Sequence, residues 1–184
     1  EGIAVGLACK ILPHNFNELI DASIAILKGE DFAIYPDFPT GGLMDVEKYN
    51  DGLQGGRLRV RARIKQVDNK TLVITEVPFT VTADSLIDSI VKACDKNQLK
   101  IKKIDNNTAS EVEIRISLPN DTSPDQTIDA LYAFTDCEIS LSPNSCVIEN
   151  EKPRFASVSE ILKVSTENTL NLLKRELEIE LGEL

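Results

Sequence analysis

The most regular pattern in the chain is an alternation of basic and apolar residues over positions 57–65. Four arginines and one lysine occupy the odd positions, and leucine, valine, alanine and isoleucine occupy the even ones. Because successive side chains of a β-strand point to opposite faces, this period of two predicts one strand with an apolar face and a basic face. Asp68 and Asn69 suit a tight turn, and the β-rich run at 71–77 completes a predicted β-hairpin.

Three helices are predicted from apolar residues at helical spacing behind a capping residue. Asn15 precedes a run that Gly29 ends, Thr82 precedes a second run, and Ser123 with Pro124 begins a third. Side-chain oxygens at a helix start accept hydrogen bonds from the amides of the first turn, and glycine often ends a helix. Proline fits the first helical position because no intrahelical hydrogen bond is lost there.

A long C-terminal helix is the last predicted element. Ser157 with Glu160 forms a capping box, and no helix-breaking residue follows before Leu181. At 1.5 Å per residue the helix would be about 40 Å long. Its leucine stripe would either contact a core or form a coiled-coil arm, and the length and mixed charges favour the arm. The stripe consists of Leu170, Leu173, Leu177, Leu181 and Leu184.

The remaining segments predict loops and short strands. Turn-forming residues crowd 30–56, so we expect a loop there with little regular structure. Taken together, the elements predict an α+β fold with a mixed, mainly antiparallel sheet, packed helices and a long C-terminal helix. The short strands are expected in two pairs about Asn106–Asn107 and Pro143–Asn144, at 100–104, 111–118, 138–141 and 146–148.

Composition is that of an ordinary folded protein. The 184 residues are 42% hydrophobic and 27% charged, and no apolar run approaches the roughly 18 residues of a membrane span. Residue 1 is glutamate and is followed by apolar residues rather than a secretory signal, so we expect the chain to be cut from a longer one.

The four cysteines form no C-x-x-C motif. They are expected to be reduced and mostly buried in a cytoplasmic protein, with no zinc site.

Charge and chemistry give no strong signal for an enzyme. The net charge of −10 argues against a simple nucleic-acid-binding module, although the strand at 57–65 is locally basic. That strand is either a solvated face balanced by nearby acids or a phosphate-facing surface. His14 is the sole histidine and suits a structural role near a helix start. We expect packing roles for Tyr35, Tyr49 and Tyr132, and no catalytic residue in the chain.

Four motifs in order resemble the A subunits of bacterial type IIA topoisomerases, DNA gyrase and topoisomerase IV. The resemblance covers essentially the whole chain and is strongest over residues 1–80. Cys9–Lys10 and the lack of an acidic-arginine run at 104–111 favour a divergent member, closer to topoisomerase IV. A domain outside these residues distinguishes the two enzymes, so both stay open. The motifs are GIAVGLA with LPHN at 2–15, PDFPTGG at 36–42, GGR with VRAR at 55–63, and ITEVPF at 74–79.

The resemblance also implies a place within an A subunit of this kind. Residues 1–28 would lead from a winged-helix domain that carries the catalytic tyrosine into a tower domain at 29–156, and 157–184 would begin a coiled-coil arm. The parent would be an ATP-dependent type II topoisomerase, an isomerase, and this part alone would be inactive. No metal or cofactor is implied here, because ATP and Mg²⁺ would bind the B subunit. Expected partners are double-stranded DNA, the B subunit, and a second copy of the parent in a homodimer, in the cytoplasm on the chromosome, with no membrane.

Candidate DNA-binding residues come from the resemblance and from the basic strand. Ile3 matches the family isoleucine that wedges between base pairs, and an inserted apolar side chain unstacks and bends a duplex. From the residues alone, Ile3 is simply a core residue. An alternative function, supported only by the net charge, is a non-catalytic acidic α+β module that binds protein. The candidate phosphate contacts are Arg57, Arg59, Arg61 and Arg63.

Overall fold

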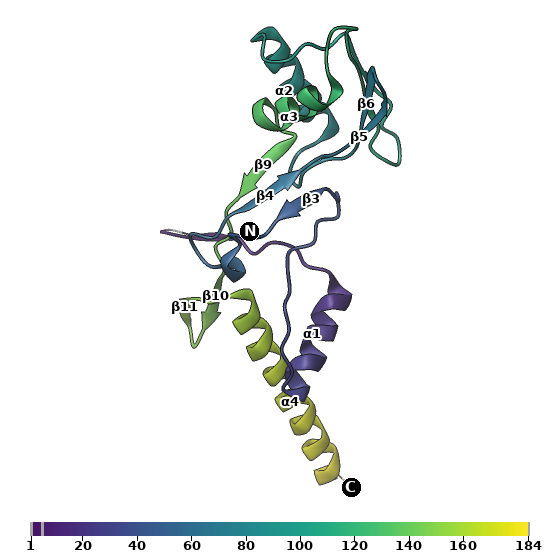
Figure 1. Ribbon diagram of the computed structural model, residues 1–184. Helices are drawn as coiled ribbons and strands as arrows, with labels where there is room; N and C mark the ends of the chain where they lie inside the picture. The colour runs from purple at the N-terminus through teal and green to yellow at the C-terminus, as the bar shows by residue number, and fades with distance from the viewer. Residues whose placement is uncertain (1, 5, 184) are drawn as a thin grey trace. The chain divides into compact units, whose positions relative to one another are not determined.

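The computed structural model describes every residue except Glu1, Val5 and Leu184 (Figure 1). The chain forms two compact units, each assembled from separate stretches. Segments 1–28 and 157–184 both fall within unit 1, whereas 29–156 is divided between the two units. The assignment of these segments to a junction, a tower and an arm stays a prediction. Unit 1 consists of Glu1–Asp37, Glu47–Arg57 and Ser142–Leu184, and unit 2 consists of Phe38–Val46 and Leu58–Leu141.

Unit 2 contains two antiparallel sheets and two helices. The first sheet has the strand order β5–β6–β8–β7, and the second has the order β3–β4–β9. Thr82 caps helix α2 in a capping box with Ser85, and Pro124 opens helix α3, as the sequence predicts. The elements are β3 (Leu43–Asp45), β4 (Leu58–Arg61), β5 (Arg63–Asp68), β6 (Thr71–Glu76), α2 (Ala83–Asp95), β7 (Lys103–Asn106), β8 (Ile114–Ser117), α3 (Pro124–Phe134) and β9 (Glu138–Leu141).

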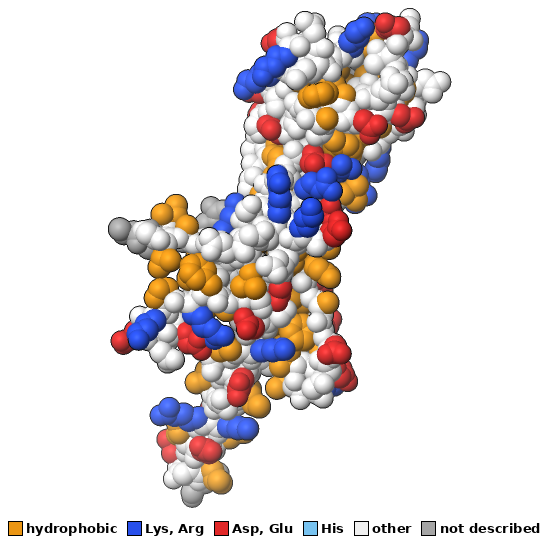
Figure 2. Space-filling view, turned by 60° about the vertical axis from the view of Figure 1, so that its left-hand side comes forward, with side chains coloured by type: hydrophobic (Ala, Val, Ile, Leu, Met, Phe, Trp, Pro, Cys, Tyr) orange, Lys and Arg blue, Asp and Glu red, His pale blue; other side chains and the backbone are white. Residues whose placement is uncertain are grey.

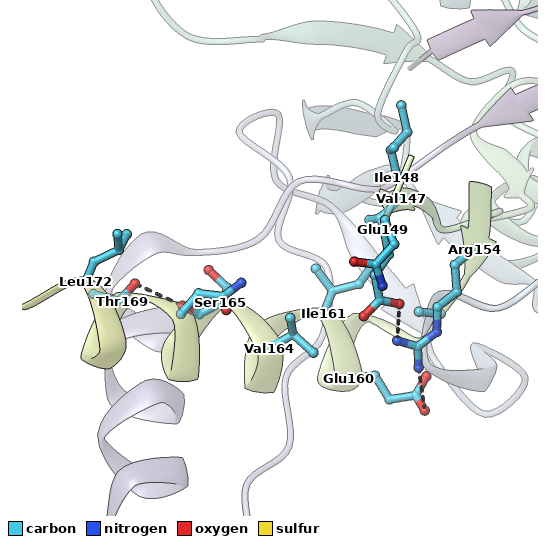
Figure 3. Close-up of a pocket in the computed structure, with 13 residues that line it drawn as sticks. Val147, Ile148, Glu149, Arg154, Glu160, Ile161, Val164, Ser165, Thr169 and Leu172 are labelled. Atoms are coloured by element: carbon cyan, nitrogen blue, oxygen red, sulfur yellow. Dashed lines mark hydrogen bonds and ion pairs between the residues drawn. The ribbon is translucent and has the colours of Figure 1, made fainter. Parts of the chain in front are cut away.

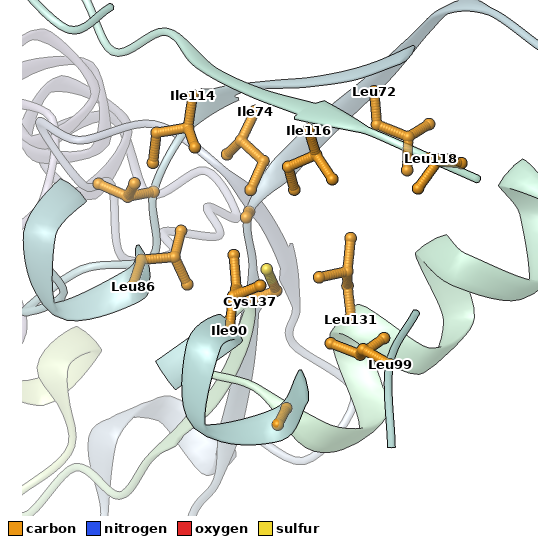
Figure 4. Packing of buried hydrophobic residues seen from close by; sticks show 13 residues of the cluster. Leu72, Ile74, Leu86, Ile90, Leu99, Ile114, Ile116, Leu118, Leu131 and Cys137 are labelled. Carbon is orange, nitrogen blue, oxygen red and sulfur yellow. The ribbon is translucent and has the colours of Figure 1, made fainter. Parts of the chain in front are cut away.

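The core of unit 2 lies between the four-stranded sheet and the two helices (Figure 4). Alternate residues of β6 and β8 point toward the helices, because the pleat places every second side chain on one face. These side chains pack against α2 and α3 with no exposed surface. The fully buried residues of this layer are Leu72, Ile74, Leu86, Ile90, Ile114, Ile116 and Leu131.

Unit 1 contains two β-hairpins and two longer helices. Asn15 accepts hydrogen bonds from the amides of Asn17 and Glu18, and Gly29 ends α1 in a left-handed conformation. Helix α4 begins with the predicted capping box: Ser157 N–H donates to the Glu160 carboxylate at 3.0 Å. The elements are β1 (Gly2–Ala4), β2 (Leu7–Cys9), α1 (Phe16–Lys28), the 3₁₀ helix η1 (Asn50–Gly52), β10 (Cys146–Glu149), β11 (Lys152–Phe155) and α4 (Val158–Glu183).

The structure confirms the α+β class, the antiparallel sheets and the long C-terminal helix. Helices α1 and α4 lie side by side in unit 1 (Figure 1). Leu173, Leu177 and Leu181 are 53%, 64% and 73% exposed along α4, whereas Leu184 lies outside the described residues. The coiled-coil role of this stripe stays a prediction. Among residues 2–4 and 6–183, no helix combines the length and hydropathy that crossing a bilayer requires.

The single strand predicted at 57–65 is wrong. The alternation itself is real, because Leu58, Val60 and Ala62 are fully buried. The hydrogen-bond partners change after Arg61, however, since β4 pairs with β3 and β9 whereas β5 pairs with β6 through a bulge at Arg63. A period of two reports which way side chains face and not which strand lies alongside, so the pattern cannot show this change.

Two further expectations need correction. The predicted loop at 30–56 contains β3 and η1. The strands at 138–141 and 146–148 do not pair with each other about Pro143–Asn144: β9 pairs with β4, and β10 pairs with β11. Both errors have the same cause. Strands of three or four residues carry too little pattern, and Pro153 argues against a strand in the segment that forms β11.

Candidate nucleic-acid interface

Ile3 lies on the first strand of the short hairpin formed by β1 and β2, directly opposite Ala8. Its side chain is 90% exposed, so the core alternative for this residue is wrong. The neighbouring residues are too small to cover it, because Gly2 and Ala8 present almost no side chain. Fully burying an isoleucine side chain is worth roughly 1.5–3 kcal/mol. An isoleucine held open in this way is suited to insertion into an apolar environment supplied by a partner.

An apolar cavity of about 390 Å³ lies beside Ile3, between the β1–β2 and β10–β11 hairpins. Cys9 and Cys146 line it, and Ile148 at its edge is 83% exposed. All four cysteines are free, and burial raises the pKa of the Cys137 thiol to about 11. Only Cys137 is fully buried, so the expectation of mostly buried cysteines is wrong. The cavity therefore combines apolar walls with half-buried thiols of no evident catalytic use.

A second groove, of about 670 Å³, runs between the β10–β11 hairpin and α4 (Figure 3). Its floor is apolar, with Val147, Ile161 and Val164 facing into it. Arg154 at its edge is already paired, at 2.7 Å with Glu149 and 3.9 Å with Glu160. Because Glu149 and Glu160 neutralise the charge of Arg154, this groove is a poor site for a phosphate.

The basic residues of β4 and β5 are matched by carboxylates in unit 2. Arg59 lies 2.6 Å from Asp45 and 4.0 Å from Glu138, and Arg63 lies 2.9 Å from Glu76. Arg61 bonds to Glu138, and its guanidinium lies 4.8 Å from the centre of the Tyr132 ring. Arg57 belongs to unit 1. On the face drawn in Figure 2, basic and acidic side chains lie interspersed.

These pairs favour the view that the basic strand is a solvated face balanced by acids. Arg59, Arg61 and Arg63 carry as much positive charge as their three carboxylate partners carry negative charge. The guanidinium side chains remain 41–52% exposed, and exposed ion pairs contribute only about 0–1 kcal/mol each. Replacing the carboxylate partner of an arginine with a DNA phosphate therefore costs little free energy. These three arginines with their partners carry no net charge that would attract DNA. DNA contact by this row stays a prediction.

The PDFPTGG and ITEVPF motifs contact each other in unit 2. Gly42 N–H donates to the Glu76 carboxylate at 2.6 Å, and the rings of Phe38 and Phe79 stack with their centres 4.7 Å apart. Gly41 and Gly42 both have a positive φ, and a Cβ on Gly42 would lie 2.7 Å from the Arg61 carbonyl oxygen. Sequence reasoning missed this contact. Gly42 and Glu76 are 34 positions apart, so no short stretch of sequence indicates that they meet.

His14, Tyr49 and Tyr132 show the environments of packing residues, whereas Tyr35 is 48% exposed. His14 Nε2 lies 3.4 Å from the Tyr49 hydroxyl, and burial lowers the pKa of His14. Burial also raises the pKa of Tyr49 to about 12 and raises that of Tyr132, whose hydroxyl donates to the Ala62 carbonyl at 2.9 Å. A nucleophilic tyrosine needs the opposite shift, toward the phenolate. Within the described residues, no three His, Cys, Asp or Glu side chains gather as metal ligands.

Comparison with known proteins gives consistent matches over the whole chain. A family model that describes the A subunits of DNA gyrase and topoisomerase IV matches residues 1–184. The chain is 46% identical to the A subunit of DNA topoisomerase 4 from Borreliella burgdorferi over 180 residues, which are 98% of this chain and 28% of that protein.

Gyrase proteins match at lower identity. The DNA gyrase A subunit of Thermotoga maritima is 31% identical over 95% of this chain and 24% of that protein, and the DNA gyrase A subunit of Chlamydia muridarum is 28% identical over 98% and 24%. The chain thus spans about a quarter of the length of these relatives. The acidic interaction module keeps no support beyond the net charge.

Glu76 should make the stability of the chain pH-dependent in the acid range. The Gly42 amide and Arg63 lower the pKa of Glu76 from its ordinary value of 4.5, so its stabilising contribution is present above that value and is lost as the pH falls through the lower folded-state pKa. Glu76→Gln should lower the free energy of unfolding at pH 7 by about 1 kcal/mol and flatten its decline toward pH 3.

Urea unfolding across this pH range measures both effects. Glu111→Gln, at an exposed glutamate of the same unit, is the control. Coincident curves for the Glu76→Gln variant and the unmodified chain would show that the motif contact adds nothing.

Proposed function

Because the chain belongs to the family of DNA gyrase and topoisomerase IV A subunits, we propose that it is the part of such a protein that binds and bends the duplex to be cut. The observation that carries this proposal is the 90% exposure of Ile3 on the β1–β2 hairpin. In the parent, one duplex would pass through a double-strand break in this bent duplex in an ATP-dependent cycle. The chain would contribute shape and contacts to this cycle rather than a reacting group.

Insertion of Ile3 between base pairs has a favourable and an unfavourable part. Unstacking a base step costs a few kcal/mol, and burying the isoleucine returns roughly 1.5–3 kcal/mol. The two nearly cancel, so phosphate contacts must supply the remaining free energy of the bent state. Arg57, Arg59, Arg61 and Arg63 are the residues we propose for these contacts. The exposure of three of them, and the low cost of exchanging their carboxylate partners, support that role.

The reacting groups and cofactors would be supplied by other parts of the complex. The nucleophilic tyrosine would lie in a winged-helix domain that precedes this segment, and ATP and Mg²⁺ would bind the B subunit. The parent would contain two A subunits and act in the cytoplasm on the chromosome. The identity of 46% to a topoisomerase 4 protein, against 31% and 28% to two gyrase proteins, supports a topoisomerase IV type for the parent.

Removing the Ile3 side chain should reduce bending without changing charge. In the complete parent protein with its ATPase partner, Ile3→Ala should lower the bent fraction of a fluorophore-labelled duplex and slow supercoil relaxation. The salt dependence of DNA binding should stay the same, because it counts phosphate contacts. Ile179→Ala is the matched control, since this isoleucine is 56% exposed on α4 and does not line the cavity beside Ile3. Normal bending by the Ile3→Ala protein would remove the wedge from the mechanism.

Neutralising the basic row should change the salt dependence of DNA binding, which Ile3→Ala leaves unchanged. Replacing Arg59, Arg61 and Arg63 with Gln should reduce the slope of log affinity against log salt by up to about one unit per lost phosphate contact. The exposed lysines 92, 96 and 100, replaced with Gln, give the same change of charge elsewhere in unit 2. If the two triple variants show the same slope of log affinity against log salt, the three arginines make no phosphate contacts and form an ordinary solvent-exposed face.

The chain alone should neither cut nor relax DNA. Tyr49 and Tyr132 have raised pKa values, and we place the nucleophile outside the chain. Incubation with supercoiled plasmid, Mg²⁺ and ATP should leave the plasmid and the ATP unchanged, whereas the complete A and B subunits relax the same plasmid. Nicked or relaxed product that increases with the concentration of the chain would contradict this.

A further inference from the structure

The hairpin that carries Ile3 has little to hold it in place by itself. Strands β1 and β2 pair over only three positions, from Gly2 opposite Cys9 to Ala4 opposite Leu7. An isolated two-stranded hairpin is marginally stable in water. The direction in which Ile3 points therefore depends on contacts between this hairpin and the rest of unit 1.

Asn144 supplies most of these contacts through three hydrogen bonds. Its backbone exchanges both bonds with Lys10, at 2.9 and 3.0 Å. Its side-chain Nδ2 donates to the carbonyl of Ala8 at 2.6 Å, and Ala8 is the residue directly opposite Ile3. One further bond lies alongside, from the Cys9 thiol to the Cys146 carbonyl at 3.1 Å.

The backbone around Asn144 is itself fixed. Ser145 is 1% exposed, its N–H donates to the Gly52 carbonyl at 3.0 Å, and its own carbonyl accepts from Ala156 N–H at 3.3 Å. Gly52 lies so close that an added Cβ would meet the Ser145 Oγ at 2.7 Å. Asn144 thus extends from a rigid part of unit 1 to the strand that faces Ile3.

From this geometry we infer that Asn144 is a positioning residue for the Ile3 wedge. Its amide holds β2, and through the Ala8–Ile3 pair it fixes the direction of the isoleucine before DNA arrives. Such pre-organisation lowers the entropy lost on insertion. This role rests on the DNA-bending function proposed above. The side-chain Oδ1 of Asn144 is buried and accepts no hydrogen bond from the described residues, so the bond to Ala8 is the side-chain hydrogen bond that truncation removes.

The test is a double-mutant cycle on DNA bending in the complete parent protein with its ATPase partner. Asn144→Ala should lower the bending equilibrium constant about two- to tenfold, the loss expected for one hydrogen bond. Asn144→Asp, nearly the same shape, should lower it at least as far, because a carboxylate oxygen would face the Ala8 carbonyl. Both variants should leave the salt dependence of binding unchanged. In an Ile3→Ala background, Asn144→Ala should cause no further loss, because coupled residues are not additive.

Asn171→Ala, at an exposed position of α4, is the matched control and should bend DNA normally. Hydrogen exchange of the amides at 7–10 should be faster in the Asn144 variants, while exchange in β6 of unit 2 stays unchanged, which establishes that the variants are folded. An equal loss from Asn144→Ala in both backgrounds would overturn the positioning role and leave the wedge intact. Bending that is unaffected by Ile3→Ala would overturn the wedge, and the positioning role with it.

Discussion

The arrangement of unit 1 depends on backbone hydrogen bonding around Asn144–Cys146, which brings together parts of the chain that are far apart in sequence. Lys10 pairs with Asn144, and the neighbouring Ser145 bonds to Gly52 on one side and Ala156 on the other. The start of the chain, the η1 turn and the residues just before α4 therefore meet at two consecutive residues. A hairpin too short to be stable alone acquires a fixed position from this junction, and so does its exposed isoleucine.

Charge is organised differently from what the composition indicates. The chain carries a net charge of −10, and in its most basic stretch the charges of Arg59, Arg61 and Arg63 are balanced by those of Asp45, Glu138 and Glu76. A surface of this kind does not draw DNA from a distance, since oppositely charged neighbours cancel beyond a Debye length. It can still bind a phosphate placed against it by other contacts. Long-range attraction is then the task of other parts of the complete protein, and this segment contributes local geometry.

Local features of the fold could be predicted from the sequence, and non-local ones could not. The caps at Asn15, Thr82 and Ser157 act within one helical turn, so a few adjacent residues decide them. The division of 57–65 between two sheets depends on β3, β6 and β9, which lie elsewhere in the chain.

The same limit applied to the candidate site. Motif order pointed to Ile3, but an apolar residue among apolar residues gives no sign of whether it is buried. Its exposure depends on where the hairpin lies in three dimensions and on the small side chains of Gly2 and Ala8 next to it. Asn144 was assigned only to a turn, because its partners are 134 and 136 positions away.

The contact between Glu76 and the two glycines restricts the order in which this protein can evolve. A Cβ at Gly41 would lie 2.6 Å from the Glu76 carboxylate, whereas a Cβ at Gly42 would meet the backbone of Arg61. A shorter side chain at position 76 would open space at position 41, where asparagine tolerates the positive φ. No side-chain change makes room at position 42. A descendant can therefore replace the glutamate first and Gly41 afterwards, but Gly42 can change only if the strand beside it moves.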